Sequence, residues 1–237
     1  MKDKAEPLAA HSRQPRSFVR RTGRVTRSQA RALQEEWLKF GVPVDNPLML
    51  NDIFGRSAPC FVEIGFGMGD SLADLAQRQP EHNFIGIEVH EAGIGRLLSL
   101  LSERAIGNVR VLRGDAVEAL ECCFSAASLA GVLVFFPDPW PKKRHHKRRL
   151  IQAPFVSLVA SRLVQGGTFR LATDWAEYAQ QMLTVIDDDG RWCNTAGAQQ
   201  FLPNQFMQGH VTRPSTKFEK RGQRLGHEIY DLCFERL

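Results

Sequence analysis

Short apolar runs alternate with helical segments from residue 59 onward, and this alternation restricts the possible fold more than any other feature. Runs typical of buried strands occur at 60–64, 83–89, 108–114, 131–136 and 167–173. Segments with helical character separate them, at 70–79, from the end of the second strand to about 104, at about 147–163 and at 175–187. Strands joined by helices pair in parallel, with helices on both faces of the sheet. We therefore expect an α/β fold with a mostly parallel sheet, and the alternating run 227–237 predicts an edge strand.

The N-terminal part differs in character from this alternating region. We predict that residues 1–50 form a basic arm with one helix and that residues 51–237 form the main domain. Thr26 and Gln29 fit a capping box at the start of that helix, and Gly41 suits its end. A chain of 237 residues is long enough to bury a substantial core.

Positive charge is concentrated in two segments of the chain. Residues 1–31 hold nine Lys or Arg against two acids, and residues 142–149 hold six Lys or Arg and no acid. Because the net charge of the whole chain is only +5, the remaining residues are acidic overall. Two basic segments on an acidic body favour a localised contact with a polyanion. A solvated basic face is the alternative for residues 142–149 taken alone.

Several classes of protein are disfavoured by composition. No apolar stretch approaches the roughly 20 residues that cross a membrane, and the basic N-terminus lacks the apolar core of a secretory signal. The five cysteines show no C-x-x-C spacing, which argues against a disulfide framework or a zinc site. We expect a cytoplasmic protein without a membrane partner, and a monomer is favoured although the sequence does not decide the oligomeric state.

A glycine-rich turn, EIGFGMGD, follows the first predicted strand and begins at Glu63. Gly65 and Gly67 permit a tight turn and let a ligand lie against the backbone. A dinucleotide loop would have glycine where Asp70 stands, and two flanking acids would repel a pyrophosphate. S-adenosylmethionine carries a sulfonium and an amino group and no phosphate, so it is the cofactor that this turn predicts.

Further acids follow the next two strands. Glu88 ends the second strand, 23 residues after Gly65, at the position from which an acid binds ribose hydroxyls. Asp115 follows the third strand, where a carboxylate accepts from an adenine amino group or, alternatively, caps the next helix. Acids at the ends of three consecutive strands beside a glycine turn favour one cofactor site. Asp74, on the helix after the turn, is expected on that helix's outer face.

The segment PDPWPKKRHHKRR follows the fourth predicted strand. That strand brings Asp138 to the carboxyl edge of the sheet, beside the expected sulfonium. Pro137, Pro139 and Pro141 stiffen the loop, since each proline fixes its own φ and restricts the residue before it. Trp140 either stacks on an unstacked base or packs against the protein's own surface. The basic run that follows is placed to reach the phosphates around a target base.

Six sequence blocks together carry a family resemblance. In order they are EIGFGMG, GIEVH, GDA, FPDPWPKKRHHKRR, ATDW and TKFEKRGQRLGH. They resemble the bacterial tRNA (guanine-N7-)-methyltransferases over about residues 58–237. The resemblance implies a Rossmann-like class I methyltransferase fold: a seven-stranded sheet with helices on both faces and one antiparallel strand near the C-terminus. It also implies methyl transfer from S-adenosylmethionine to N7 of guanine 46 in the variable loop of tRNA, which forms N7-methylguanosine.

The resemblance also implies roles for individual residues. It places cofactor contacts at Glu63, Glu88, Asp115 and Asp138, with Asp138 as the catalytic acid. Substrate contacts are implied at Lys142, Asp174, Thr216, Lys217, Phe218 and Glu219. An RNA-binding run is implied at Arg144, His145, His146, Lys147, Arg148 and Arg149. No metal is expected, because guanine N7 has a lone pair and no proton to lose.

Two other functions compete with this interpretation. A D-P-W sequence after the fourth strand is similar to the motif of enzymes that methylate adenine amino groups. That motif alone therefore does not identify which base of RNA or DNA is the target. A non-catalytic RNA-binding protein on a methyltransferase fold is the other alternative. The complete set of acids at the strand ends argues against it.

Overall fold

The computed structural model of the protein describes residues 24–44, 46–202 and 217–237. Within the last helix, α9 (Lys217–Arg224), the side chains of residues 217, 218, 220 and 223 lie outside this description.

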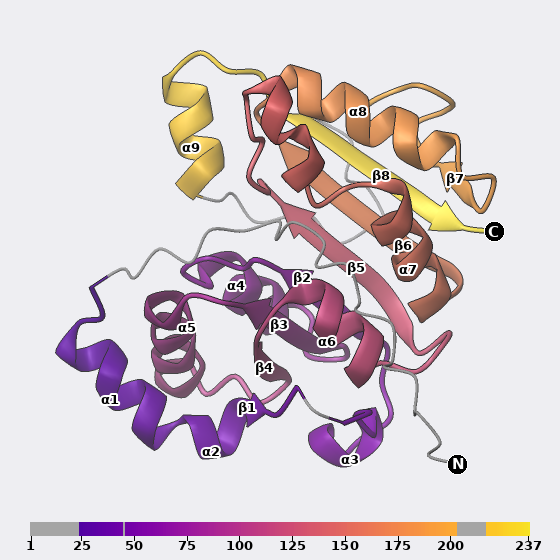
Figure 1. Ribbon diagram of the computed structural model, residues 1–237. Coiled ribbons are helices and arrows are strands. Elements are labelled where there is room, and N and C mark those ends of the chain that lie inside the picture. The colour runs from indigo at the N-terminus through magenta and orange to yellow at the C-terminus, as the bar shows by residue number, and fades with distance from the viewer. Residues whose placement is uncertain (1–23, 45, 203–216) are drawn as a thin grey trace, which may run out of the picture.

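One twisted sheet forms the centre of the described structure (Figure 1), with the strand order β1-β4-β3-β2-β5-β6-β8-β7. Its strands are β1 (Gly41–Val42), β2 (Cys60–Ile64), β3 (Asn83–Glu88), β4 (Val109–Arg113), β5 (Leu129–Phe135), β6 (Leu163–Thr173), β7 (Trp192–Asn194) and β8 (Tyr230–Arg236). The strands from β1 to β6 pair in parallel, whereas β8 is antiparallel to both of its neighbours. The predicted mostly parallel sheet with one antiparallel strand near the C-terminus is confirmed.

Two strands change the details of the prediction. The sequence predicts β8 as an edge strand, but the three-residue strand β7 pairs with its outer side, so β8 is an internal strand. At the opposite edge, the two-residue strand β1 pairs with β4. The described sheet therefore has eight strands instead of seven.

Helices cover both faces of the sheet, as expected for parallel strands joined by helical crossovers. On one face α4 (Asp70–Arg78) and α5 (Glu91–Glu103) bury Leu72, Leu75, Leu97 and Leu101 against β3 and β4. On the other face lie α6 (Ala116–Cys123), α7 (Ala153–Arg162) and α8 (Ala176–Asp187). None of the described helices is long and apolar enough to span a bilayer.

The described part of the predicted arm packs on the main domain. Helix α1 (Arg27–Glu35) begins with the predicted capping box, in which the side chains of Thr26 and Gln29 each accept from the other's backbone N–H. A Cβ added to Gly95 of α5 would lie 2.6 Å from the Gln29 carbonyl oxygen, so this glycine allows α1 and α5 to pack closely. The chain continues through α2 (Trp37–Phe40), strand β1 and α3 (Leu50–Phe54). The one expected helix is thus divided, and the segment also contributes a strand.

The helix predicted from about residue 147 begins later. The basic run forms a 3-10 helix, η1 (Lys143–Arg148), and the α-helix begins only at Ala153. Pro154 occupies the first turn of α7, where its missing N–H and fixed φ favour a helix start. Six cations within eight residues also disfavour an α-helix, because like charges three or four positions apart repel each other.

Candidate functional site

A cavity of about 530 Å³ opens at the carboxyl ends of β2, β3 and β5. Parallel α/β sheets bind ligands at this edge. Three of the carboxylates predicted from the sequence line the cavity, and each comes from the end of a different strand: Glu63, Glu88 and Asp138. Glu63 and Glu88 are buried, whereas Asp138 is exposed at the cavity mouth. The structure therefore brings two buried carboxyl groups and an accessible acid to one cavity.

The glycine turn between β2 and α4 forms one wall of this cavity. Gly65, Gly67 and Gly69 have φ of 70°, 59° and 78°, a left-handed region that favours glycine. A Cβ at Gly65 or Gly67 would meet nothing within 4 Å, so the backbone there faces open space. A Cβ at Gly93 of α5 would come within 2.0 Å of the Gly67 carbonyl oxygen, so α5 supports the turn by direct contact.

The side chain of Glu88 holds this turn in place. Its Oε2 accepts a hydrogen bond from the backbone N–H of Gly67 at 3.0 Å. Its Oε1 accepts from the N–H groups of Val89 and His90, at 2.7 and 3.1 Å. An ionised carboxylate offers about four acceptor positions, so these three amides leave room for about one further donor. The predicted contact with a ribose hydroxyl is compatible with this geometry, and the anchoring of the turn is a second role that the sequence does not reveal.

Asp115 has the helix-capping role that was its alternative prediction, whereas the position of Asp74 differs from the prediction. Asp115 is the N-cap of α6, where its Oδ1 accepts from the N–H groups of Val117 and Glu118. The residues on either side of it line the cavity. Asp74 was expected on the outer face of its helix, and that prediction is wrong: Asp74 lines the cavity and pairs with Arg104 at 2.5 Å. It lies one turn after Asp70 on the same face of α4, a four-residue spacing that could have identified it.

The loop that carries Asp138 has an unusual backbone. Phe136 and Trp140, on either side of Asp138, have φ of 53° and 45°. Bulky residues in this left-handed region cost about 1–3 kcal/mol each, and such strain persists only where the surrounding structure enforces it. The Phe136 N–H donates to the Ala172 carbonyl of β6, which anchors the start of the loop.

The outer part of the basic run is accessible. Lys142, Arg144 and Lys147 are exposed, and the Arg148 guanidinium lies over the Trp140 ring at 5.0 Å. The His145 ring contacts Trp140 edge-on, and desolvation together with four neighbouring cations lowers the pKa of this histidine. Trp140 thus packs against the protein's own basic run, while the run presents several cations to solvent.

The surroundings of His146 and Arg149, the inner part of the run, differ from those expected for RNA-binding residues. The side chain of Arg149 is only 1% exposed and His146 is half-buried, and both contact Glu177 of α8. A guanidinium with this burial is poorly placed for the predicted phosphate contact. The adjoining Leu150 and Ile151 could have indicated it, because two apolar residues show where the chain enters the core.

The remaining predicted substrate residues are Asp174, in the turn between β6 and α8, and residues in or next to α9. Asp174 is half-buried, and its Oδ2 lies 3.3 Å from Nδ1 of His227. Gly222 of α9 packs against it, since a Cβ there would lie 3.2 Å from the Asp174 side chain. Glu219 is half-buried on the same helix. Thr216 and the side chains of Lys217 and Phe218 lie outside the described residues.

The chemistry of the cavity suits S-adenosylmethionine. Its volume is in the range of sites for ligands of this size. Its ionisable lining groups include the acids Glu63, Asp70, Asp74, Glu88 and Asp138, and no Lys or Arg lines it among the residues that the structure describes. Such a site attracts a cationic ligand and repels a phosphate.

Comparison with known families identifies one match over most of the chain. The model of a family described as "Putative methyltransferase" matches residues 57–232. A tRNA (guanine-N(7)-)-methyltransferase from Thiobacillus denitrificans is 54% identical over 93% of this chain and 95% of its own length. A protein with the same name from Neisseria gonorrhoeae is 49% identical over 97% of this chain and 94% of its own length.

Solved structures with the same fold include two methyltransferases of low sequence identity. The aminoglycoside resistance methyltransferase NpmB1 aligns with a TM-score of 0.52 and 13% identity, over 79% of this chain and 92% of that protein. A 30S ribosomal A1408 methyltransferase from an uncultured bacterium aligns with a TM-score of 0.51 and 16% identity over the same shares. These similarities concern the fold alone.

Proposed function

The chain belongs to the tRNA (guanine-N(7)-)-methyltransferase family, and from this premise we infer that it methylates N7 of guanine 46 in the variable loop of tRNA. The product is N7-methylguanosine, and S-adenosylmethionine is the methyl donor. One observation carries the assignment of the site: the acid-lined cavity and the exposed basic run lie at the two ends of the same short loop, on which Asp138 stands.

The reaction needs positioning more than proton transfer. When bound, S-adenosylmethionine supplies a methyl group on a sulfonium, and guanine N7 has a lone pair to receive it. Asp138 accepts hydrogen bonds from the N1–H and amino group of the guanine, and its charge favours the positive charge that develops on the purine. Pro137 and Pro139 restrict the loop, so little entropy is lost when the guanine binds.

The cofactor contacts that we propose are Glu63, Gly65, Gly67, Glu88, Asp115 and Asp138. Glu63 and Glu88 keep the buried part of the cavity negative, which favours a ligand with an ammonium and a sulfonium group. We propose substrate contacts for Lys142 and Asp174, and for Thr216, Lys217, Phe218 and Glu219 near the C-terminus.

tRNA is bound by the basic run outside the cavity. Arg144, His145, Lys147 and Arg148 contact phosphates around the target guanine, and the exposed ammonium groups contribute mainly through release of counterions. We further propose a cytoplasmic location, a catalytic domain formed by residues 51–237, and a basic arm formed by residues 1–50.

Mapping the methylated nucleotide tests the proposed target. tRNA is incubated with the protein and S-adenosylmethionine, reduced with sodium borohydride and treated with aniline, which cuts the strand at N7-methylguanosine. We expect one cut in the variable loop, and no cut in a matched tRNA that has adenosine at position 46. A cut elsewhere would contradict the position, and methylated tRNA without any cut would indicate methylation at another atom.

A further inference from the structure

Arg149 is the last cation of the basic run, and it differs from the others in its burial. Its side chain is 1% exposed, while Arg144 and Lys147 of the same run are exposed. A buried guanidinium is costly unless its donors are satisfied by good acceptors. The partners of Arg149 therefore indicate what this side chain does in the folded protein.

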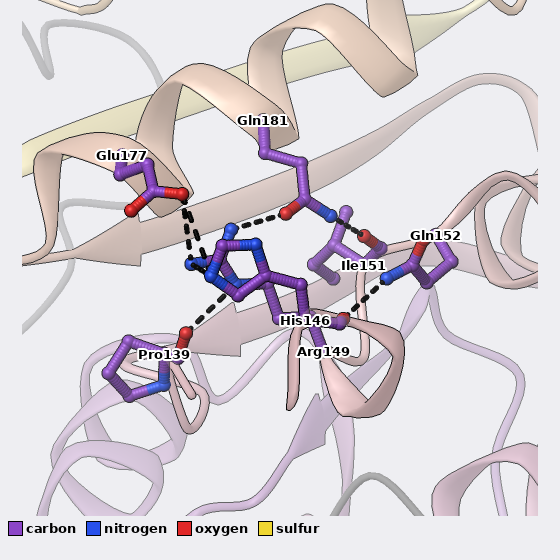
Figure 2. A network of polar contacts seen from close by, with 7 residues as sticks. All are labelled: Pro139, His146, Arg149, Ile151, Gln152, Glu177 and Gln181. Carbon is purple, nitrogen blue, oxygen red and sulfur yellow. Dashed lines mark hydrogen bonds and ion pairs between the residues drawn. The ribbon is translucent and has the colours of Figure 1, made fainter. Parts of the chain in front are cut away.

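The guanidinium of Arg149 joins the Asp138 loop to helix α8 (Figure 2). Its Nε donates to the backbone carbonyl of Pro139 at 2.8 Å, and its Nη1 donates to Oε1 of Gln181 at 2.5 Å. Its Nη2 lies 3.0 Å from Nε2 of His146 and 3.7 Å from Oε1 of Glu177. The donors on the three guanidinium nitrogens are thus directed at groups of this chain.

Buried side chains of helix α8 support this contact. The guanidinium of Arg149 lies over the ring of Tyr178 at 4.9 Å, and that ring is completely buried. The Tyr178 hydroxyl accepts from the Ile151 N–H, and Nε2 of Gln181 donates to the Ile151 carbonyl. The chain directly after Arg149 is therefore attached to α8.

The carbonyl that Arg149 binds belongs to the residue directly after Asp138. It lies in the loop whose flanking residues, Phe136 and Trp140, have left-handed φ. A loop in this conformation relaxes unless contacts hold it. Burial raises the pKa of Tyr178 above its ordinary value, and the charge of Asp138 adds to the increase, whereas the charge of Arg149 opposes it.

We propose that Arg149 is a positioning residue that holds the Asp138 loop in its reactive conformation, and that it is not one of the phosphate contacts of the basic run. Asp138 approaches the guanine, and Arg149 acts on the reaction only through the Pro139 carbonyl. The kinetic part of this inference rests on the proposed function, whereas the tether itself does not.

Replacement by lysine separates the two roles. Lysine keeps the positive charge but has no planar fork, so one ammonium cannot bind both the Pro139 carbonyl and Gln181 in the same way. For a phosphate contact, Arg149→Lys should keep tRNA affinity and rate. For a positioning residue, we expect the single-turnover rate at saturating tRNA to fall about 10²-fold in both Arg149→Lys and Arg149→Ala, because small displacements of a reacting group have effects of this size. Their tRNA dissociation constant and its salt dependence should stay near those of the parent.

Lys147→Ala is the matched comparison from the same run. Lys147 is exposed, and we expect its removal to weaken tRNA binding and to reduce the slope of log affinity against log salt by about 0.7–0.9, whereas the Arg149 variants should change neither. If Arg149→Ala instead gave this pattern, and Arg149→Lys behaved as the parent, the inference would be overturned in favour of a phosphate contact.

Hydrogen exchange tests the tether without tRNA or methyl transfer. In the full-length Arg149→Lys protein, the peptide that carries the amides of Asp138 and Trp140 should exchange faster than in the parent, while peptides from β2 and β3 remain unchanged. Unchanged exchange in the loop would contradict the inference, and faster exchange throughout the sheet would show a general loss of stability instead. A parent protein that failed to methylate tRNA would refute the proposed function alone, because the exchange measurement would still test the tether.

Gln181→Met provides a second variant if the Arg149 variants do not fold. It keeps the approximate size of the side chain and removes the acceptor that orients Nη1 of Arg149. Loop exchange should again be faster and the single-turnover rate lower, with tRNA affinity kept. Loop exchange and rate equal to those of the parent would overturn the inference.

Discussion

Glu88→Gln tests the role of the carboxylate that anchors the glycine turn. The carboxylate accepts from three backbone amides, those of Gly67, Val89 and His90. An amide side chain has only one oxygen. If that oxygen keeps the contacts to Val89 and His90, the new NH₂ group faces the Gly67 N–H, and two donors oppose each other in a site where Glu88 is 6% exposed.

The expected cost follows from this geometry. A hydrogen bond to a charged group contributes about 1.5–3 kcal/mol, and a buried donor left without an acceptor costs a similar amount. We expect the variant to bind S-adenosylhomocysteine about 2 kcal/mol more weakly, which is about 30-fold in the dissociation constant. The fold should persist, because the change affects a turn at the edge of the sheet.

Titration calorimetry with S-adenosylhomocysteine and no tRNA measures this effect. Glu118→Gln is the matched control, since Glu118 is exposed on α6 and outside the cavity lining. Its affinity should equal that of the parent. An affinity of Glu88→Gln within twofold of the parent would refute the reasoning that the carboxylate holds the turn for the cofactor.

Three further predictions concern the active acid, the basic run and a buried thiol. Asp138→Asn should lower the single-turnover rate of methylation at least about 10²-fold, while Asp52→Asn, at an exposed position, should leave the rate unchanged. Equal rates for the two variants would show that Asp138 has no catalytic role. The double variant with Arg144→Ala and Lys147→Ala should reduce the slope of log affinity against log salt by about 1.4–1.8, measured by filter binding. An unchanged slope would show that neither side chain contacts a phosphate of the tRNA. Burial raises the pKa of the Cys60 thiol to about 12, so the folded state retains a proton that the unfolded state loses above about pH 9. The free energy of unfolding should therefore fall between pH 8 and 10 more steeply in the parent than in Cys60→Ala, and parallel curves from urea denaturation would contradict this.

The strands were the most predictable part of the fold. The run at 60–64 coincides with β2, and the other predicted strands overlap β3 to β6, because parallel strands buried on both faces read as continuous apolar runs. The three residues of β7 form too short a segment to produce such a signal. Their pairing with β8 depends on a tertiary contact, and it makes β8 an internal strand.

The site was predictable in its acids and less so in its arginines. Glu63 and Glu88 lie in the last residues of β2 and β3 and Asp138 follows β5, so the strand order alone brings them to one edge of the sheet. Arg149 lies in a uniformly basic run, where composition cannot distinguish an exposed cation from a buried one. Its partner Gln181 is 32 residues away on α8, and only the folded chain brings the two together.

The identity of the methylated nucleoside tests the central claim most directly. The protein is incubated with tRNA and S-adenosylmethionine that carries a deuterated methyl group, and the tRNA is then digested to nucleosides for mass spectrometry. We predict that the label appears in 7-methylguanosine and that Asp138→Asn greatly reduces it. Label in methylated adenosine or in another guanosine isomer, or tRNA that remains unlabelled, would contradict the account.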